Sequence, residues 1–217
     1  MENDVKEFLS NLLKQLKSID YIKPEDIPNI DLYMDQVTTF MDEQLAASKR
    51  YDSDKILTKT MINNYAKNNL LPSPEKKKYS KEHVLTLLFI YYFKNILSIN
   101  DIRSILNPLT DKYFGNDDGF TMQDVYNEVF GLESEESQKL LKDLGKKYKI
   151  AGETFADFPQ EDQKFLHTFS FICMLSYDVY IKKMIIERMI DQLNSGDSDS
   201  SDSDEHRSDD KKDKKSK

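Results

Sequence analysis

The chain has 217 residues, of which 38% are hydrophobic, and its formal net charge is −8. This length and apolar content suffice for one compact domain or two small ones. The six Gly and six Pro residues are too few for a turn-rich all-β protein and favour helices. The single cysteine, Cys173, excludes an internal disulfide and a CxxC zinc or redox motif. We therefore expect a mainly α-helical protein that holds no metal ion or other cofactor.

Two terminal segments stand apart from the predicted core. Residues 1–20 begin MENDVKEF, which lacks the features of a signal peptide, and their apolar stripe predicts an amphipathic helix. Residues 195–217 alternate Ser with Asp before a Lys-rich end, so we expect a disordered tail. The most apolar run, residues 165–186, contains His167 and Asp178 and predicts a buried helix rather than a membrane span. Together these features predict a cytoplasmic protein.

The region between the first helix and residue 55 predicts one further helix. Residues 21–28 contain two prolines and form a linker. Residues 31–45 follow it with apolar side chains on one side of a helix, namely Leu32, Val37, Phe40, Met41 and Leu45. The polar residues 46–54 then predict a loop.

Residues 55–106 form the one basic segment of this acidic chain. They hold nine Lys and Arg residues against three acids, a balance of +6, whereas residues 1–54 and residues 107–194 each come to −6. A basic segment in an acidic protein can direct DNA, a polyanion, to that segment. The alternative is that the charge run is only a solvated face, and charge alone does not decide between the two.

A short polar helix opens the basic segment. Thr58 is a candidate N-cap, so residues 59–68 would form about two and a half turns of helix. Its apolar residues face one way, and Lys, Thr and Asn side chains gather on the other side: Lys59, Thr60, Asn63, Asn64 and Lys67. Lys neutralises phosphates, and Asn can make a bidentate contact to adenine in the major groove. The alternative is a surface helix with a polar exterior.

A loop rich in proline and lysine follows the polar helix. Pro72 and Pro74 lead to three consecutive lysines and a tyrosine, Lys76, Lys77, Lys78 and Tyr79. A hairpin here would hold three cations beside the helix, as a wing does. Because phosphate contacts supply most of the affinity for DNA and its salt dependence, such a loop suits anchoring that is independent of sequence.

Two helices are predicted directly after the wing. Ser80 would cap a long apolar helix whose side chains supply the packing surface for the wing. Ser98 or Asn100 would cap a shorter helix, which Asn107 and Pro108 would end.

The C-terminal region, residues 110–194, predicts three more helices. After a turn at residues 114–120, short apolar faces predict helices over residues 125–130 and 137–144, and Gly145 would close the second. The longest helix, residues 161–193, is apolar around most of its first half. Such a helix is either central to a core or buried against a partner.

The order and spacing of residues 55–106 resemble the DNA-binding domain of the MerR family of bacterial regulators. TMINNYAKNNLLPSPEKKKYS lies where that family has a recognition helix, a double-Leu-Pro and a basic wing, and ILSINDIRSIL lies where it has a short helix after the wing-packing helix. Residues 21–109 are also similar to an uncharacterised bacterial family, DUF1836, in LYMDQVTTFMDEQL and LTKTMINNY. That family is thought to share the MerR-like fold. The resemblance implies a MerR-like winged helix-turn-helix with a small β wing.

The resemblance also assigns roles to single residues. Asn63 and Asn64 stand where MerR members commonly have an Arg and a Tyr that hold phosphates, and Asn69 stands where they usually have a Gly. Lys77 and Tyr79 occupy the positions of an Arg and a Tyr in the wing, although the hairpin lacks the wing's usual Gly. The first helix of the motif is separated from the recognition helix by an unusually long connection.

We predict a DNA-binding transcriptional regulator that is not an enzyme. The three histidines lie on separate predicted elements, and no phosphate-binding glycine loop is present. His83 is expected at the surface or on a phosphate, and Cys173 as a small buried thiol. The expected DNA contacts are Lys59, Thr60, Asn63, Asn64, Lys67, Lys76, Lys77, Lys78 and Tyr79.

A homodimer on double-stranded DNA is expected, because one short recognition helix reads few bases. The C-terminal helices would dimerise or sense a small-molecule or protein effector. The alternative function is a protein-interaction module whose winged helix no longer binds DNA and whose longest helix holds a partner. The neutral Asn63 and Asn64 and the acidic surroundings favour this alternative.

Overall fold

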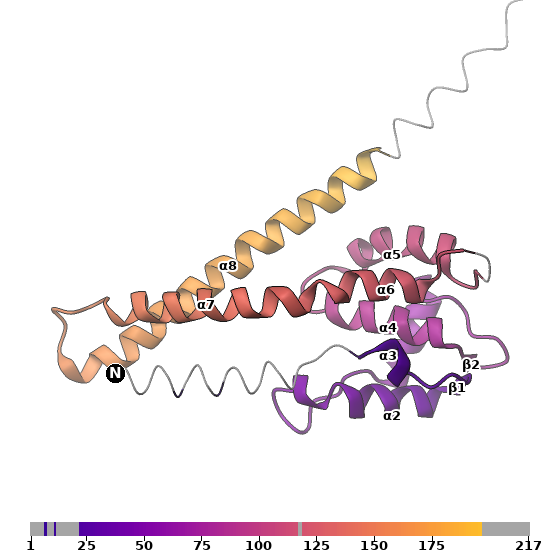
Figure 1. Cartoon of the computed structure of the whole chain (residues 1–217), viewed down its shortest axis with the longest axis horizontal. Coiled ribbons are helices and arrows are strands. Elements are labelled where there is room, and N and C mark those ends of the chain that lie inside the picture. The colour runs from indigo at the N-terminus through magenta and orange to yellow at the C-terminus, as the bar shows by residue number, and fades with distance from the viewer. Residues whose placement is uncertain (1–6, 8–10, 12–21, 117–118, 197–217) are drawn as a thin grey trace, which may run out of the picture.

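The computed structural model describes residues 7, 11, 22–116 and 119–196. Apart from residues 7 and 11, the predicted N-terminal helix lies outside the described residues, as does the predicted disordered tail from residue 197. The described part is mainly α-helical, as the sequence predicts. A body of short helices occupies one end, and a hairpin of two long helices projects from it (Figure 1).

The helices and strands have the following bounds. Two 3₁₀ turns span Pro24–Asp26 and Ala46–Ser48, and two strands span Leu32–Tyr33 (β1) and Lys78–Tyr79 (β2). The body helices are α2 (Met34–Gln44), α3 (Lys59–Lys67), α4 (Lys81–Phe93), α5 (Ile99–Tyr113) and α6 (Met122–Gly131). The hairpin consists of α7 (Glu133–Gly152) and α8 (Gln160–Gly196).

Helix α4 is the centre of the body. Its residues 83–91 are all buried, so the helix is apolar on every side and must be surrounded by other elements. Phe89 places its ring edge-on against Tyr126 of α6, with centroids 5.6 Å apart, and Tyr126 lies 4.4 Å from Phe130. The hydroxyl of Tyr126 donates to the carbonyl of Ile22 at 2.9 Å, which attaches the start of the described body to α6.

The strand β1 corrects the predicted start of the first body helix. Leu32 and Tyr33 are extended and pair antiparallel with Tyr79 and Lys78 of β2, respectively. The helix begins only at Met34. Pairing to a strand 46 residues away in sequence is a tertiary effect that the helical spacing of Leu32 does not reveal.

Two predicted helix ends are also wrong. Helix α5 continues through Pro108 to Tyr113, although an interior proline costs about 3 kcal/mol. The apolar face of α5 continues on both sides of the proline, with Leu106 buried and Leu109 packed on the core, and this burial offsets the lost hydrogen bond. Helix α7 likewise continues through Gly145 to Gly152, because it packs along α8.

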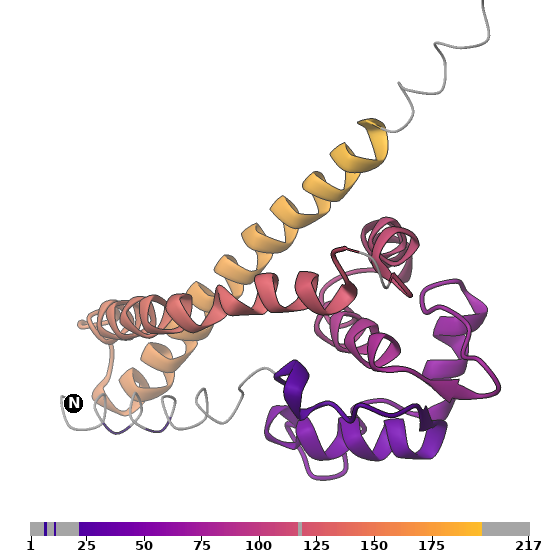
Figure 2. The ribbon, with the colours of Figure 1, turned by 45° about the vertical axis from the view of Figure 1, so that its right-hand side comes forward.

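The hairpin of α7 and α8 is held by contacts between the two helices and by a contact of α8 with α5. The ring of Tyr148 on α7 meets Phe171 on α8 edge-on at 5.2 Å, and Ile190 of α8 is buried with 3% exposure. Figure 2 shows that α8 crosses α7 and that the end of the hairpin where the two helices connect lies far from the body. None of the described helices has the length and hydropathy needed to cross a membrane.

The outer side of α8 corrects two predictions. The helix is not central to a core, because many of its large apolar side chains remain exposed within the described structure. Cys173 is exposed on it rather than buried. The sequence gives the apolar residues of a helix but does not reveal which face of it neighbouring elements cover.

Candidate nucleic-acid interface

Helix α3 lies on the body with its polar face outward. Its N-cap is Thr58, as predicted, and the Thr58 hydroxyl oxygen accepts a hydrogen bond from the backbone N–H of Met61 at 3.2 Å. Ile62 and Tyr65 are buried. The predicted contact residues on the opposite face are all exposed, namely Lys59, Thr60, Asn63, Asn64 and Lys67. The structure therefore brings these five side chains together on one open surface.

The end of α3 is anchored by a left-handed residue and two leucines. Asn69 has a φ of 55°, which Asn tolerates better than most residues, so its exchange for Gly is accommodated. The backbone N–H groups of Leu70 and Leu71 both donate to the carbonyl of Tyr65, at 2.8 and 3.3 Å. Both leucines are buried, which fixes the direction in which the chain enters the wing.

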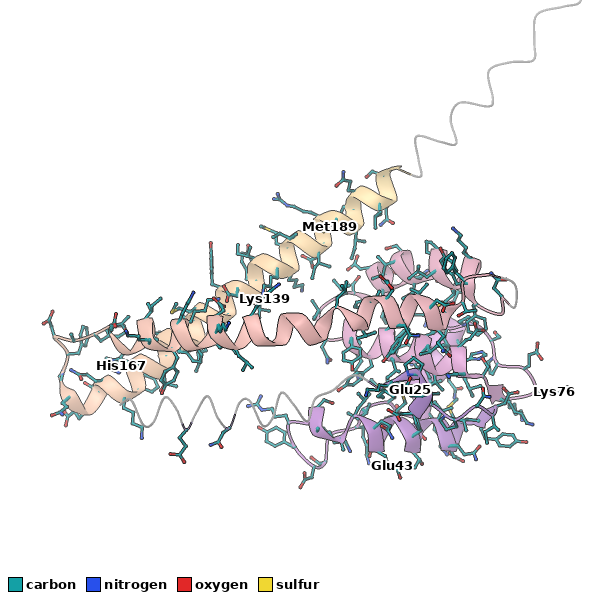
Figure 3. The ribbon with its side chains drawn as sticks, in the orientation of Figure 1. Glu25, Glu43, Lys76, Lys139, His167 and Met189 are labelled. Carbon is teal, nitrogen blue, oxygen red and sulfur yellow. The ribbon has the colours of Figure 1, made fainter. Side chains whose placement is uncertain are left out.

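The wing ends in a tight turn without glycine. The backbone N–H of Lys78 donates to the carbonyl of Glu75 at 2.8 Å, and the residues between them, Lys76 and Lys77, have φ angles of 47° and 64°. Two consecutive left-handed residues define the turn preferred in two-residue hairpins, where Asn-Gly is usual. Both lysines are exposed. Lys76 lies at the outer end of the body, far from the end of the α7–α8 helix pair that carries His167 (Figure 3).

The two remaining wing residues on the predicted contact surface differ in exposure. Lys78 is half-buried, and its ammonium group lies 5.6 Å from the centre of the Tyr33 ring, a cation–π arrangement. Tyr79 is only 3% exposed, and burial raises the pKa of its hydroxyl. Tyr79 thus belongs to the core beneath the wing and does not lie on the exposed surface with the other predicted contact residues.

His83 fixes the base of the wing. Its Nδ1 accepts a hydrogen bond from the backbone N–H of Ser80 at 3.0 Å, and its ring lies edge-on to Tyr79 and Phe114. It is 4% exposed, so the predicted surface position is wrong. Burial lowers the pKa of His83, while the backbone of Ser73 and the charge of Asp31 partly offset this.

Acidic side chains from α2 border the basic face. Lys59 forms an ion pair with Asp35 of α2, and the Lys49 ammonium lies 2.8 Å from Asp42. The Lys49 hydrogen bond lowers the pKa of Asp42. A hollow of about 370 Å³ between α2 and the start of α3 is lined by both signs of charge, including Asp42, Glu43, Lys55 and Lys59. The sequence alone did not reveal that Lys59 is partly neutralised.

The long connection between α2 and α3 is attached to the core. Ile56 and Leu57 are each 4% exposed, and the Lys94 ammonium donates to the carbonyl of Ile56 at 2.6 Å. Ser48 and Tyr91 share a hydrogen bond between their hydroxyl groups. Partial burial lowers the pKa of Lys94. The connection therefore holds α3 in place without the tight turn usual in helix-turn-helix motifs.

The part of the chain that includes both α3 and the wing also matches a known family model. Residues 22–129 match the family model of a domain of unknown function, DUF1836. The DUF1836 match extends beyond residue 109, where the predicted similarity ends, into α6, and leaves the α7–α8 hairpin outside. No curated protein and no solved structure was found to match the chain. Among the described residues, no group of three or more His, Cys, Asp and Glu side chains could hold a metal ion.

Proposed function

We propose that the chain is a DNA-binding transcriptional regulator, in which the outer face of α3 lies in the major groove and the wing holds phosphates. The observation that carries the proposal is the wing turn. Lys76 and Lys77 both adopt a left-handed conformation that costs about 1–3 kcal/mol for each residue. Two lysines in positions suited to Asn-Gly place positive charge at the tip at the expense of stability.

The arrangement of the elements supports a winged helix-turn-helix of the MerR-like kind. Helix α2 contacts α3, the strands β1 and β2 pair, and α4 packs beneath β2. In such folds the second helix enters the groove and the hairpin lies along the backbone. In the proposed complex, the five exposed polar side chains on α3 meet the groove and the two exposed lysines on the wing meet the phosphates.

The direct test is binding of the full chain to a fluorescent duplex of random sequence at low salt, followed by selection of genomic fragments. We expect the Lys76→Glu/Lys77→Glu variant to lose most of its affinity. A matched control is Lys142→Glu/Lys146→Glu, which makes the same charge change on the exposed side of α7. Absence of binding by the unaltered protein, or equal loss in both variants, would contradict the proposal.

The alternative function is a protein-interaction module whose winged helix does not bind DNA. The observation that favours it is the acidic border of α3, where Asp35 is already paired with Lys59. If the chain fails to bind DNA at low salt but a partner protein is displaced by charge reversal of the wing, this alternative replaces the first.

We further propose that the regulator acts in the cytoplasm as a homodimer. One α3 helix presents about two and a half turns, which reads few base pairs, whereas two copies on a two-fold axis double the site. The C-terminal hairpin lies outside the DUF1836 match and is the part available for pairing or for an effector.

A further inference from the structure

The largest group of exposed apolar side chains on the described molecule lies along α8. We call five of these side chains, each more than half exposed, the outer stripe: Phe165 (71%), Phe169 (51%), Ile172 (54%), Val179 (63%) and Tyr180 (63%). Residues 165, 169, 172, 176 and 179 follow alternating steps of four and three, the spacing of a helix that packs along another helix. Ser176 occupies the one polar position in this series.

Over residues 165–180, the outer stripe lies on a different side of α8 from the residues that contact α7. Phe171 packs on Tyr148 of α7, and Asp178 forms an ion pair with Lys147 of α7. Toward its end, α8 contacts α5, and the alternating steps of the stripe, continued past residue 179, reach Ile190, which is buried there. The stripe is thus the exposed part of a face whose C-terminal end packs on the body, on a helix that α7 contacts from another side.

We propose that a second copy of this chain covers the outer stripe, with the two α8 helices antiparallel. This interface deepens the dimer of the proposed function, although its evidence comes from α8 alone. Five side chains of these sizes and exposures present roughly 700 Å² per copy, close to the ~800 Å² per partner of a standard interface. A two-fold interface uses the same patch on both copies, so no additional surface is required.

The charges at the two ends of the stripe favour the antiparallel orientation. Glu161 and Asp162 precede it, and Lys182 and Lys183 follow it; all four residues are exposed. Antiparallel pairing brings the acidic end of each helix to the basic end of the other. Parallel pairing would set like charges side by side, which is unfavourable.

The same charge pairing locates the two-fold axis. If Glu161 of one copy lies opposite Lys183 of the other, and Asp162 opposite Lys182, the midpoint of α8 in the interface is residue 172. Ile172 then meets its own copy, and Phe165 lies opposite Val179. The exposed Cys173 lies next to the axis, so two copies would bring their thiols close together.

The first test measures the mass of the full chain in solution without DNA, by sedimentation velocity over a range of concentrations. We expect a dimer, and we expect Ile172→Glu to weaken self-association on the order of 100-fold because both copies lose the contact. Ile30→Glu is the control, since Ile30 is 67% exposed on the body. Circular dichroism checks that both variants remain folded. A monomeric chain, or a dimer that Ile172→Glu leaves intact, would overturn the interface.

The second test does not depend on disrupting the interface. A bismaleimide should cross-link the unaltered chain through Cys173, and Cys173→Ser should abolish the product. In the Cys173→Ser background, Glu161→Cys mixed with Lys183→Cys should give a mixed cross-linked dimer, while each variant alone should not. Self-cross-linking of Glu161→Cys would show parallel pairing and refute the proposal.

These outcomes are separable from the proposed DNA binding. A monomer that still binds DNA through Lys76 and Lys77 would overturn the interface and leave the function standing. A dimer that does not bind DNA would overturn the proposed function and leave the interface standing. A monomeric chain whose outer stripe holds a different protein would also overturn the proposal, because the occupant would not be a second copy.

Discussion

The salt dependence of DNA binding gives the sharpest quantitative test of the wing. Each phosphate contact lowers the slope of log affinity against log salt by about 0.9. Lys76 and Lys77 are exposed at the tip, so Lys76→Gln/Lys77→Gln removes two contacts and reduces the steepness by about 1.8. If both proteins bind equally at about 1 M salt, the variant binds about 60-fold more weakly at about 0.1 M.

Fluorescence anisotropy on one random-sequence duplex, titrated at five or so salt concentrations, measures both the slope and the affinity at each salt concentration. The control Lys142→Gln/Lys146→Gln makes the same change in net charge on α7, and we expect its slope to match that of the unaltered chain. If the wing variant keeps the original slope, Lys76 and Lys77 do not hold phosphates. If the control loses as much steepness as the wing variant, general charge rather than the wing directs the DNA.

Three further predictions concern neighbouring residues. Replacing the turn by Lys76→Asn/Lys77→Gly should stabilise the fold by about 1–2 kcal/mol in urea unfolding while weakening DNA binding, because Asn-Gly suits two left-handed positions; unchanged stability would show that the turn is unstrained. Asp35→Asn frees Lys59 from its ion pair and should raise DNA affinity by up to about eightfold at about 0.1 M salt, whereas lower affinity would mean that Asp35 positions the lysine productively. Burial lowers the pKa of His83 below its ordinary value of 6.5, so on acidification the unfolded chain takes up the proton before the folded chain does. The buried neutral ring therefore contributes fully to the free energy of unfolding above pH 6.5, and this contribution is lost as the pH falls from there toward the folded-state pKa. His83→Gln should flatten this part of the urea-stability profile, and an equally steep profile would assign the pH dependence to other groups.

The elements that the sequence predicts well are those with a strong local signal. The cap at Thr58 and the two faces of α3 follow from helical spacing and side-chain preferences within a few residues, and the structure confirms them. Ser98 caps α5, one of the two predicted candidates, through a hydrogen bond from the backbone N–H of Asp101 at 3.2 Å. The surface of α3 could therefore be assembled from the sequence.

The features that the sequence misses depend on contacts between distant segments. Pro108 normally ends a helix, but the core that receives Leu106 and Leu109 continues past it. Tyr79 carries a polar hydroxyl, yet the strand pairing with Leu32 directs it inward. The exposure of Cys173 depends on which side of α8 meets α7. In each case local preference is outweighed by packing that only the three-dimensional arrangement defines.

The anchored connection before α3 has a consequence for engineering. Because Lys94 and the buried Ile56 and Leu57 secure the chain leading into α3, the position of α3 depends on this anchored connection rather than on a short turn from α2. Side chains on the open face of α3 can then be exchanged as a set without altering the connection that orients the helix. The body thus offers a scaffold onto which a different surface helix can be grafted, with Lys94 as the residue to leave untouched.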